Sequence, residues 1–217
     1  LLTALRTAAA SAVSIKHLAR PDSKVLGIVG AGHQSTFQLR AALEQRPFEK
    51  VLAWNKTPEK LERLASVARE KGLPFQSVSL EQLCGEADVV ITITSSFSPV
   101  IAEGLIRPGT HLACMGTDTK GKQEVAPEIV AGSTVFTDEV VQSTSIGEAQ
   151  HAFRLGMIDA AAIIPIGVVV NGDHPGRRSA EEITLFDGTG VGLQDLAVAS
   201  AAVDLALARG TAIEVDA

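Results

Sequence analysis

Short apolar runs alternate with longer segments of mixed polarity along most of the chain. The runs are rich in Val, Ile, Leu and Ala, which is typical of strands buried on both faces of a sheet. We predict strands over residues 50–54, 74–78, 87–93, 110–115 and 133–137, in addition to the run that opens residues 24–32. Helices are predicted between them, over residues 33–43, 80–85 and 127–131, and one that opens at Thr57-Pro58-Glu59. This alternation predicts an α/β fold with a doubly wound, mostly parallel sheet.

The two ends of the chain are patterned differently from its middle. Residues 1–20 contain no acid and carry apolar residues at helical spacing, so we predict a helix there. In the last third, helical segments are predicted over residues 146–158 and 163–171, the latter around Pro165, followed by a strand over residues 182–186. A long helix is predicted over residues 190–209, with Gly210 as its C-cap.

Length and charge limit the classes of protein to which the chain can belong. With 217 residues and 46% hydrophobic content it can bury a real core as one large domain, or as one domain plus a fragment. A net charge of −6 and a pI near 5.4 argue against a nucleic-acid or an anionic-membrane surface. The longest apolar stretch, residues 160–170, is broken by Pro165 and is too short to span a bilayer.

The metal-ligating residue types are few and scattered. Cys84 and Cys114 lack metal-ligand spacing and fit reduced thiols, which predicts a cytoplasmic protein. The five histidines include no pair four residues apart, so the sequence predicts no metal site.

One strand–turn–helix segment carries a ligand signal. Residues 24–32, KVLGIVGAG, pass directly into the predicted helix, as in a dinucleotide-binding turn, where a diphosphate meets backbone N–H groups at a helix N-terminus. Gly30 permits the tight turn and Gly32 lets the phosphates approach the backbone, while Ser35 replaces the usual third glycine or alanine. The alternative is a glycine-rich turn without a ligand. The predicted cofactor-binding residues of this turn are Gly30, Ala31, Gly32, His33, Gln34 and Ser35.

The loop after the second predicted strand bears on which dinucleotide binds. NAD-binding domains carry a carboxylate about 20 residues past the glycines, which binds the ribose hydroxyls. This chain has Asn55, Lys56 and Thr57 there, without an acid. Such residues would donate hydrogen bonds to the 2′-phosphate of NADP, so we predict NADP, with NAD as second choice. The missing acid also disfavours S-adenosylmethionine enzymes. In the alternative interpretation, Lys56 faces water in a solvated loop.

Residues 115–124, MGTDTKGKQE, hold the candidate for acid–base chemistry. They follow a predicted strand directly, and in an open α/β sheet the carboxyl ends of the strands line the ligand crevice. Asp118, flanked by Lys120 and Lys122, is a plausible general acid or base beside the nicotinamide. A polar surface turn of the same composition is the alternative.

The chain resembles the ornithine cyclodeaminase/μ-crystallin family through nearly all of its length. Four stretches carry the resemblance by their order and spacing: residues 2–11, LTALRTAAAS; 30–35, GAGHQS; 116–124, GTDTKGKQE; and 183–196, ITLFDGTGVGLQDL. Members are NAD(P)-dependent cyclodeaminases, alanine dehydrogenases and imine reductases, together with the μ-crystallins. They pair a Rossmann domain with a separate substrate and dimerisation domain.

The resemblance implies roles for particular residues. Arg6 matches the arginine that holds the substrate carboxylate, Asp118 matches the catalytic aspartate, and Lys122 matches the lysine of the same loop. The family usually has serine where this chain has Gly188, and Thr189 is the residue that could substitute for the lost hydroxyl. The complete set of predicted cofactor-binding residues adds Thr94, Gly116 and Thr189 to the glycine turn and to Asn55, Lys56 and Thr57.

The activity implied is hydride transfer between NAD(P)H and an amino acid or its imine. We expect a reductase of cyclic or linear imino acids, such as Δ1-pyrroline-2-carboxylate or a ketimine. Three alternatives stay open: an ornithine cyclodeaminase that releases ammonia with catalytic NAD, an alanine dehydrogenase, and a non-catalytic NADPH-binding protein similar to the μ-crystallins.

The resemblance also bears on domain organisation. In the family, the stretch matching LTALRT follows the substrate domain, so residues 1–217 are expected to form the NAD(P)-binding Rossmann domain of a two-domain protein whose N-terminal substrate and dimerisation domain is missing here. Residues 1–20 would be the helix that joins the two domains, and residues 190–210 a long C-terminal helix. We expect a homodimer formed through the other domain, with a small amino or imino acid as substrate.

Overall fold

An eight-stranded parallel sheet forms the centre of the protein, in the order β3-β2-β1-β4-β6-β10-β8-β9. The computed structural model describes residues 1–213; residues 214–217, the end of the predicted domain, lie outside the described residues. The strands are β1 (Val25–Val29), β2 (Lys50–Trp54), β3 (Phe75–Ser77), β4 (Val89–Thr92), β6 (His111–Cys114), β8 (Thr134–Thr137), β9 (Ile164–Pro165) and β10 (Thr184–Asp187). The predicted doubly wound α/β fold is confirmed.

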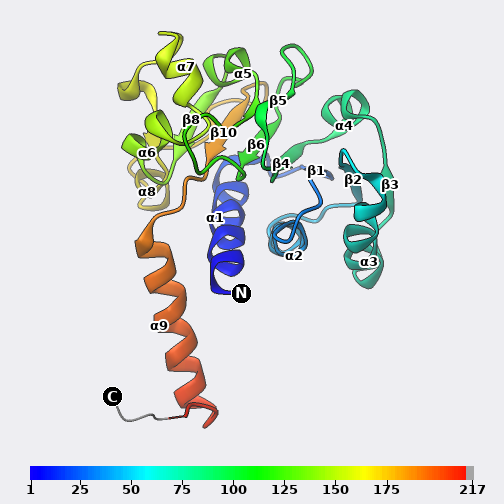
Figure 1. Ribbon diagram of the computed structural model, residues 1–217, viewed down its shortest axis with the longest axis vertical. Coiled ribbons are helices and arrows are strands. Elements are labelled where there is room, and N and C mark those ends of the chain that lie inside the picture. Colours follow the sequence, from blue (N-terminus) through cyan, green and yellow to red (C-terminus); the bar gives the residue numbers. More distant parts are fainter. Residues whose placement is uncertain (214–217) are drawn as a thin grey trace.

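Helices cover both faces of this sheet (Figure 1). One face carries α1 (Leu2–Leu18), α2 (Ser35–Leu43), α3 (Glu62–Glu70) and α8 (Ile166–Val170), and the other carries α4 (Leu80–Glu86), α5 (Pro127–Ala131), α6 (Val140–Ser145) and α7 (Gln150–Arg154). Successive strand residues point to opposite faces, so Ile91 belongs to the first core and Val90 to the second. This two-sided burial is why the strands read as continuous apolar runs.

Helix α1 packs against α2 and against the sheet, and several of its buried residues are small. Ala4, Ala8 and Ala12 are buried, and they let the helix lie close to its neighbours. Farther along α1, Ser14 hydrogen-bonds the fully buried His111 of β6 at 3.1 Å. Burial is the main reason why the pKa of His111 falls to about 3, so this histidine is neutral.

Several elements differ from the sequence-based prediction. The segments β5 (Phe97–Ile101) and β7 (Gln123–Val125) form a separate two-stranded parallel ribbon that was not predicted, because Pro99 and the exposed side chains of β5 hide the strand pattern. The prediction of a helix over 146–158 is wrong except for α7, because Gly147 packs against the Asp187 carboxylate and Gly156 adopts a φ of +69°. The predicted helix at 163–171 begins as strand β9, and Pro165 is the N-cap of α8.

The helix predicted from Thr57 begins as a 3-10 helix over Pro58–Leu61 and continues as α3. Thr57 occupies the N-cap position, but its side chain makes no capping hydrogen bond.

Helix α9 (Gly192–Ala208) extends away from the rest of the molecule beside α1 (Figure 1). None of its residues is buried. Its C-cap is Arg209, and Gly210, which was predicted as the C-cap, follows one residue later with a φ of +63° and ends the helix. Within residues 1–213, no helix combines the length and the apolarity needed to cross a bilayer.

Candidate cofactor and active site

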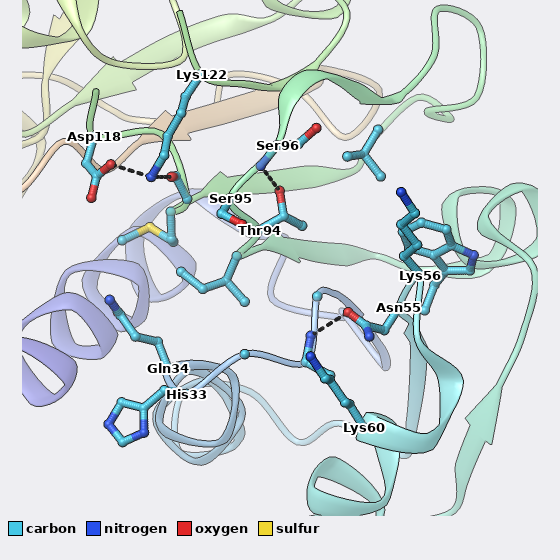
Figure 2. A pocket seen from close by; sticks show the side chains of 18 residues that line it. His33, Gln34, Asn55, Lys56, Lys60, Thr94, Ser95, Ser96, Asp118 and Lys122 are labelled. Carbon is cyan, nitrogen blue, oxygen red and sulfur yellow. Dashed lines mark hydrogen bonds and ion pairs between the residues drawn. The ribbon is translucent and has the colours of Figure 1, made fainter. Parts of the chain in front are cut away.

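A cleft of about 550 Å³ opens at the carboxyl ends of β1, β2, β4 and β6. The chain runs outward from β1 to β2 and β3 on one side and to β4 and β6 on the other, so the cleft lies at the switch point of the sheet. The structure brings eleven of the predicted residues to its wall (Figure 2): Gly30, Ala31, Gly32, His33, Gln34, Asn55, Lys56, Thr94, Gly116, Asp118 and Lys122.

The glycine turn between β1 and α2 presents free backbone donors to the cleft. Gly30 has a φ of +109°, and a Cβ there would lie 2.5 Å from the Ile93 carbonyl oxygen, so the position requires glycine. A Cβ on Gly32 would meet no protein atom within 4 Å. Among residues 1–213, no protein acceptor pairs with the backbone N–H groups of Gly32, His33 and Gln34. Three free amides at the start of a helix form a suitable site for a diphosphate.

Asn55 links this turn to the loop after β2. Its Oδ1 accepts a hydrogen bond from the Ala31 amide at 3.0 Å, and its Nδ2 donates to the Thr57 carbonyl at 2.7 Å. The side-chain oxygen and one of the two N–H donors of Asn55 are therefore paired within the protein. Lys56 and Lys60 are exposed and line this end of the cleft (Figure 2), which makes it electropositive.

Asp118 and Lys122 lie at the opposite end of the cleft (Figure 2). Lys122 Nζ is 2.6 Å from Asp118 Oδ1, and it also approaches the Gly116 carbonyl at 3.4 Å. Partial burial raises the pKa of Asp118, but the hydrogen bond and the charge of Lys122 outweigh it, so the pKa lies below its ordinary value. Asp118 is therefore an anion at neutral pH, and 62% of its side chain is exposed.

The loop that carries Asp118 rests on buried carboxylates. Glu124 and Glu148 lie beneath it, and Asp187 lies at the end of β10; all three are buried. Burial raises the pKa of Glu124, and it raises the pKa of Glu148 to about 8, with the negative charge of Glu124 adding to the effect. Burial likewise raises the pKa of Asp187 to about 7. None of the three was predicted, because a lone acid in sequence carries no sign of burial.

Arg6 does not line the cleft. It projects from α1 toward the first turn of α9, where its Nε lies 3.4 Å from Asp195 Oδ2 and its Nη1 donates to Gln194 Oε1 at 3.4 Å. A Cβ on Gly190 would lie 2.3 Å from Nη1, so the guanidinium also packs on the loop before α9. These contacts are long, and the Arg6 guanidinium keeps N–H donors that are not used in them. Such free donors suit a group that binds an anion.

Three other predicted residues lie outside the cleft wall. The hydroxyl of Ser35 donates to the Gly32 carbonyl at 2.8 Å, which stabilises the turn from within. Thr57 is exposed in the loop after β2. The hydroxyl of Thr189 donates to Asp138 at 2.6 Å, so it stabilises the loop after β10.

Gly188 is explained by its neighbour. A Cβ at this position would lie 2.4 Å from Met115 Cε and 2.7 Å from Met115 Sδ. Met115 is one of the residues lining the cleft. The glycine thus provides the space that the thioether fills.

Seven residues of the cleft wall were not predicted: Trp54, Lys60, Ile93, Ser95, Ser96, Val100 and Met115. Met115 directly follows the buried strand β6, and Ser95 and Ser96 lie in the loop after the buried strand β4. Their position at the carboxyl edge of the sheet could therefore have been used to predict them. Within residues 1–213, no group of three or more His, Cys, Asp or Glu side chains is placed to hold a metal ion.

Comparison with known proteins shows extensive similarity. The chain is 60% identical over 216 residues to the iminosuccinate reductase of Paracoccus denitrificans, covering 100% of this chain and 67% of that protein. The crystal structure of that reductase in complex with NAD+ superimposes with a TM-score of 0.97 over 100% of this chain and 67% of that one.

More distant relatives follow the same pattern. The alanine dehydrogenase of Archaeoglobus fulgidus is 35% identical over 95% of this chain and 64% of its own length. The Δ1-pyrroline-2-carboxylate reductase of Thermococcus litoralis, solved with NADH and L-proline, superimposes with a TM-score of 0.93 at 33% identity, covering 99% of this chain and 67% of that one.

The chain thus spans about two thirds of the length of these relatives. A sequence model of the ornithine cyclodeaminase/mu-crystallin family matches residues 1–210. The chain belongs to the ornithine cyclodeaminase/mu-crystallin family.

Proposed function

We propose that this chain is the cofactor-binding part of an NAD(P)H-dependent reductase of imino acids. The observation that carries the proposal is one cleft with two chemically distinct ends: free helix amides at one and the Asp118–Lys122 pair at the other. The 60% identity to an iminosuccinate reductase makes a linear imino diacid the first substrate to test. Pyrroline-2-carboxylate reductases are more distant, at 31–33% identity, and make the cyclic imine the second.

The reaction requires a protonated imine. A hydride leaves C4 of the dihydronicotinamide and forms a C–H bond at the imine carbon, while the electron pair of the C=N bond moves to nitrogen. The product is an amine, which takes up a further proton to become an ammonium group, and the cofactor leaves oxidised. With iminosuccinate the product is aspartate.

Asp118 is suited to stabilise the cation in this reaction. Because Lys122 holds its pKa below the ordinary value, Asp118 remains a carboxylate and would accept a hydrogen bond from the iminium N–H. The ammonium of Lys122 is the adjacent group that can donate the further proton to the amine. Arg6 would bind the substrate carboxylate, exchanging its long contacts with Asp195 and Gln194 for a bidentate pair.

For the cofactor we propose NADH first, with NADPH as the alternative. NADPH was predicted from the missing acid, and Lys56 and Lys60 support it because they could pair with a 2′-phosphate. Against this, the oxygen and one of the two N–H donors of Asn55 are already paired with Ala31 and Thr57, and the 60% identical reductase was solved with NAD+. The ratio of kcat/KM for the two cofactors decides between them. A preference for NADPH that is lost in Lys56→Ala would support the prediction of NADP from the acid-free loop.

The test of the activity is cofactor oxidation by the intact protein with iminosuccinate, with Δ1-pyrroline-2-carboxylate and with pyruvate plus ammonia. Asp118→Asn is expected to lower kcat by at least about 100-fold while leaving NADH affinity within a few fold. Asp173→Asn, at an exposed acid outside the cleft, is the control. Loss of NADH binding in parallel with turnover would make Asp118 a structural residue instead.

The same assay separates the alternatives. Ammonia release from ornithine with catalytic NAD would identify a cyclodeaminase, and fast reduction with pyruvate plus ammonia an alanine dehydrogenase. Tight cofactor binding without turnover of any substrate would identify a binding protein.

We further propose that a second, substrate and dimerisation domain packs on α9. Leu193, Leu196, Val203 and Leu207 are exposed on this helix. Together with the small residue Ser200, they recur alternately three and four residues apart, which is the spacing of a helix seam. If α9 lies in such an interface, Leu196→Lys combined with Val203→Lys should shift the intact protein from dimer to monomer in sedimentation velocity. An unchanged dimer would place the interface elsewhere.

A further inference from the structure

A buried carboxylate joins the two loops that form the reacting end of the cleft. Glu124 belongs to β7 and is fully buried. Its Oε1 accepts a hydrogen bond from the Thr94 amide at 2.6 Å, in the loop after β4. Its Oε2 accepts from the Gly116 amide at 2.8 Å, in the loop after β6, and from the Thr92 hydroxyl at 2.7 Å. Thr94 and Gly116 both line the cleft.

The fit around this carboxylate leaves little freedom. A Cβ on Gly116 would lie 2.5 Å from Glu124 Oε1 and 2.3 Å from the Thr94 carbonyl oxygen. The Thr94 amide, the Gly116 amide and the Thr92 hydroxyl all donate hydrogen bonds to Glu124, so each of these hydrogen bonds needs an acceptor oxygen on its side chain. A glutamine would direct an N–H₂ group at one or more of these donors.

A second buried carboxyl group, that of Glu148, supports the first. Glu148 Oε1 accepts hydrogen bonds from the amides of Glu124 and Val125, each at 2.8 Å, which fixes β7. Its Oε2 accepts from the hydroxyl of Thr117, the residue immediately before Asp118. The loop carrying Asp118 is therefore held from beneath at successive residues.

We propose that Glu124 is a positioning residue for hydride transfer: by binding both loop amides, it sets the separation of the loops between which the nicotinamide and the imine meet, and with it the direction of Asp118. This inference rests on the proposed reductase function. Burying the Glu124 carboxyl group costs free energy. In return, a single rigid group accepts hydrogen bonds from both loops and holds them together. Transfer rates depend steeply on such placement, because misplacement by about 1 Å can cost about 100-fold in rate.

The test is Glu124→Gln in the intact protein, with Glu128→Gln, an exposed acid in α5, as the matched control. We expect kcat to fall by about 100-fold or more while NADH affinity changes by less than about 3-fold, and the control to match the wild type. The kinetic isotope effect with 4-deuterated NADH should rise, because hydride transfer becomes rate-limiting. A purely structural role would not produce this separation of kcat from binding.

Two results would overturn the proposal. One is an unchanged kcat in Glu124→Gln; the other is a loss of NADH binding equal to the loss of turnover. If Glu124→Gln does not fold, Thr92→Val serves instead, since it removes the hydroxyl that donates to Glu124 Oε2 and keeps the side-chain shape. It is expected to lower kcat by about 10-fold at unchanged NADH affinity, and an unchanged kcat would contradict the proposal.

Failure of the proposed function is visible separately, because the wild type would then oxidise neither NADH nor NADPH with any of the imino acids. In that case, amide hydrogen exchange still tests whether Glu124 holds the two loops together. The Thr94 and Gly116 amides should exchange at least about 10 times faster in Glu124→Gln than in the wild type. Equal exchange rates would show that Glu124 does not hold the loops.

Discussion

Two glycines of the same turn are expected to respond oppositely to substitution. Gly30→Ala forces a side chain into left-handed backbone and against the Ile93 carbonyl, so we expect it to lower the free energy of unfolding by about 1–3 kcal/mol or more. Gly32→Ala meets open space and should leave unfolding unchanged, yet weaken NADH binding by at least about 10-fold, because its methyl group lies where the diphosphate approaches. Urea unfolding and calorimetric titration measure the two effects. Wild-type NADH affinity in Gly32→Ala would place the diphosphate elsewhere.

Gly188 and Met115 are expected to act as a coupled pair. Gly188→Ser would displace the end of the methionine side chain, and Met115 is part of the cleft wall. We therefore expect kcat/KM to fall by about 10-fold, and Met115→Ala in the same chain to recover much of the loss. A double-mutant cycle should give a coupling of about 0.5–3 kcal/mol, as for residues in contact. Additive effects of the two substitutions would mean that the displaced Met115 side chain moves into free space and does not contact the bound cofactor or substrate.

The site residues recognised in the sequence are those whose chemistry is local. The glycine turn at Gly30 and Gly32, the acid-free loop at Asn55 and the loop at Asp118 each lie directly after an apolar strand, so order along the chain predicted their place in space. Glu124 could not be found in this way. Its partners Thr92 and Thr94 are about thirty residues earlier, and only the folded sheet brings them together.

At the scale of elements, burial decides what could be predicted. Strand β2 was predicted with its observed bounds, Lys50–Trp54, because its apolar run is buried on both faces. The ribbon of β5 and β7 was missed because an exposed strand containing Pro99 has no such pattern. The prediction of one helix over 146–158 was wrong because Gly147 packs closely against the Asp187 side chain at the end of β10 and interrupts the helical pattern.

The junction between β10 and α9 depends on one acid. Asp138 accepts hydrogen bonds from the amide and hydroxyl of Thr189 at 3.0 and 2.6 Å, from the Gly190 amide at 2.8 Å and from Gln194 Nε2 at 3.0 Å. In Asp138→Ala these donors lose their acceptor, so we expect a loss of about 1–3 kcal/mol in stability and faster amide exchange in the first turn of α9. Exchange measured by mass spectrometry checks this, with Asp173→Ala as the control. Equal protection of that turn in both variants would show that α9 is held by other contacts.

For the molecule as a whole, the buried acids set the pH dependence of stability. The pKa values of Glu148 and Asp187 rise to about 8 and about 7, above the ordinary values of 4.5 and 3.8, chiefly because burial disfavours the charged form. Between about pH 5 and pH 8 the folded protein thus binds more protons at these groups than the unfolded chain. These two groups therefore lower the free energy of unfolding as pH rises, each by up to about 1.4 kcal/mol per pH unit.

Urea unfolding at pH 5.5, 7 and 8.5 tests this slope. Acids such as Asp88 and Glu182, whose pKa values lie below the ordinary range, contribute the opposite slope below this window. Buried His111, with its pKa lowered from 6.5 to about 3, also contributes the opposite slope, and it does so within the lower part of the window, by at most one proton against the two carboxyls.

Asp187→Asn is the matched variant. Its amide oxygen can keep the bonds from Ser143 and the Ala149 amide, and its nitrogen falls where Oδ1 has no partner, so it removes the titration with little loss of contact. We expect it to flatten the pH 5.5–7 part of the curve. Stability that rises between pH 5.5 and 8.5 in the wild type would mean that these carboxyls are ionised throughout.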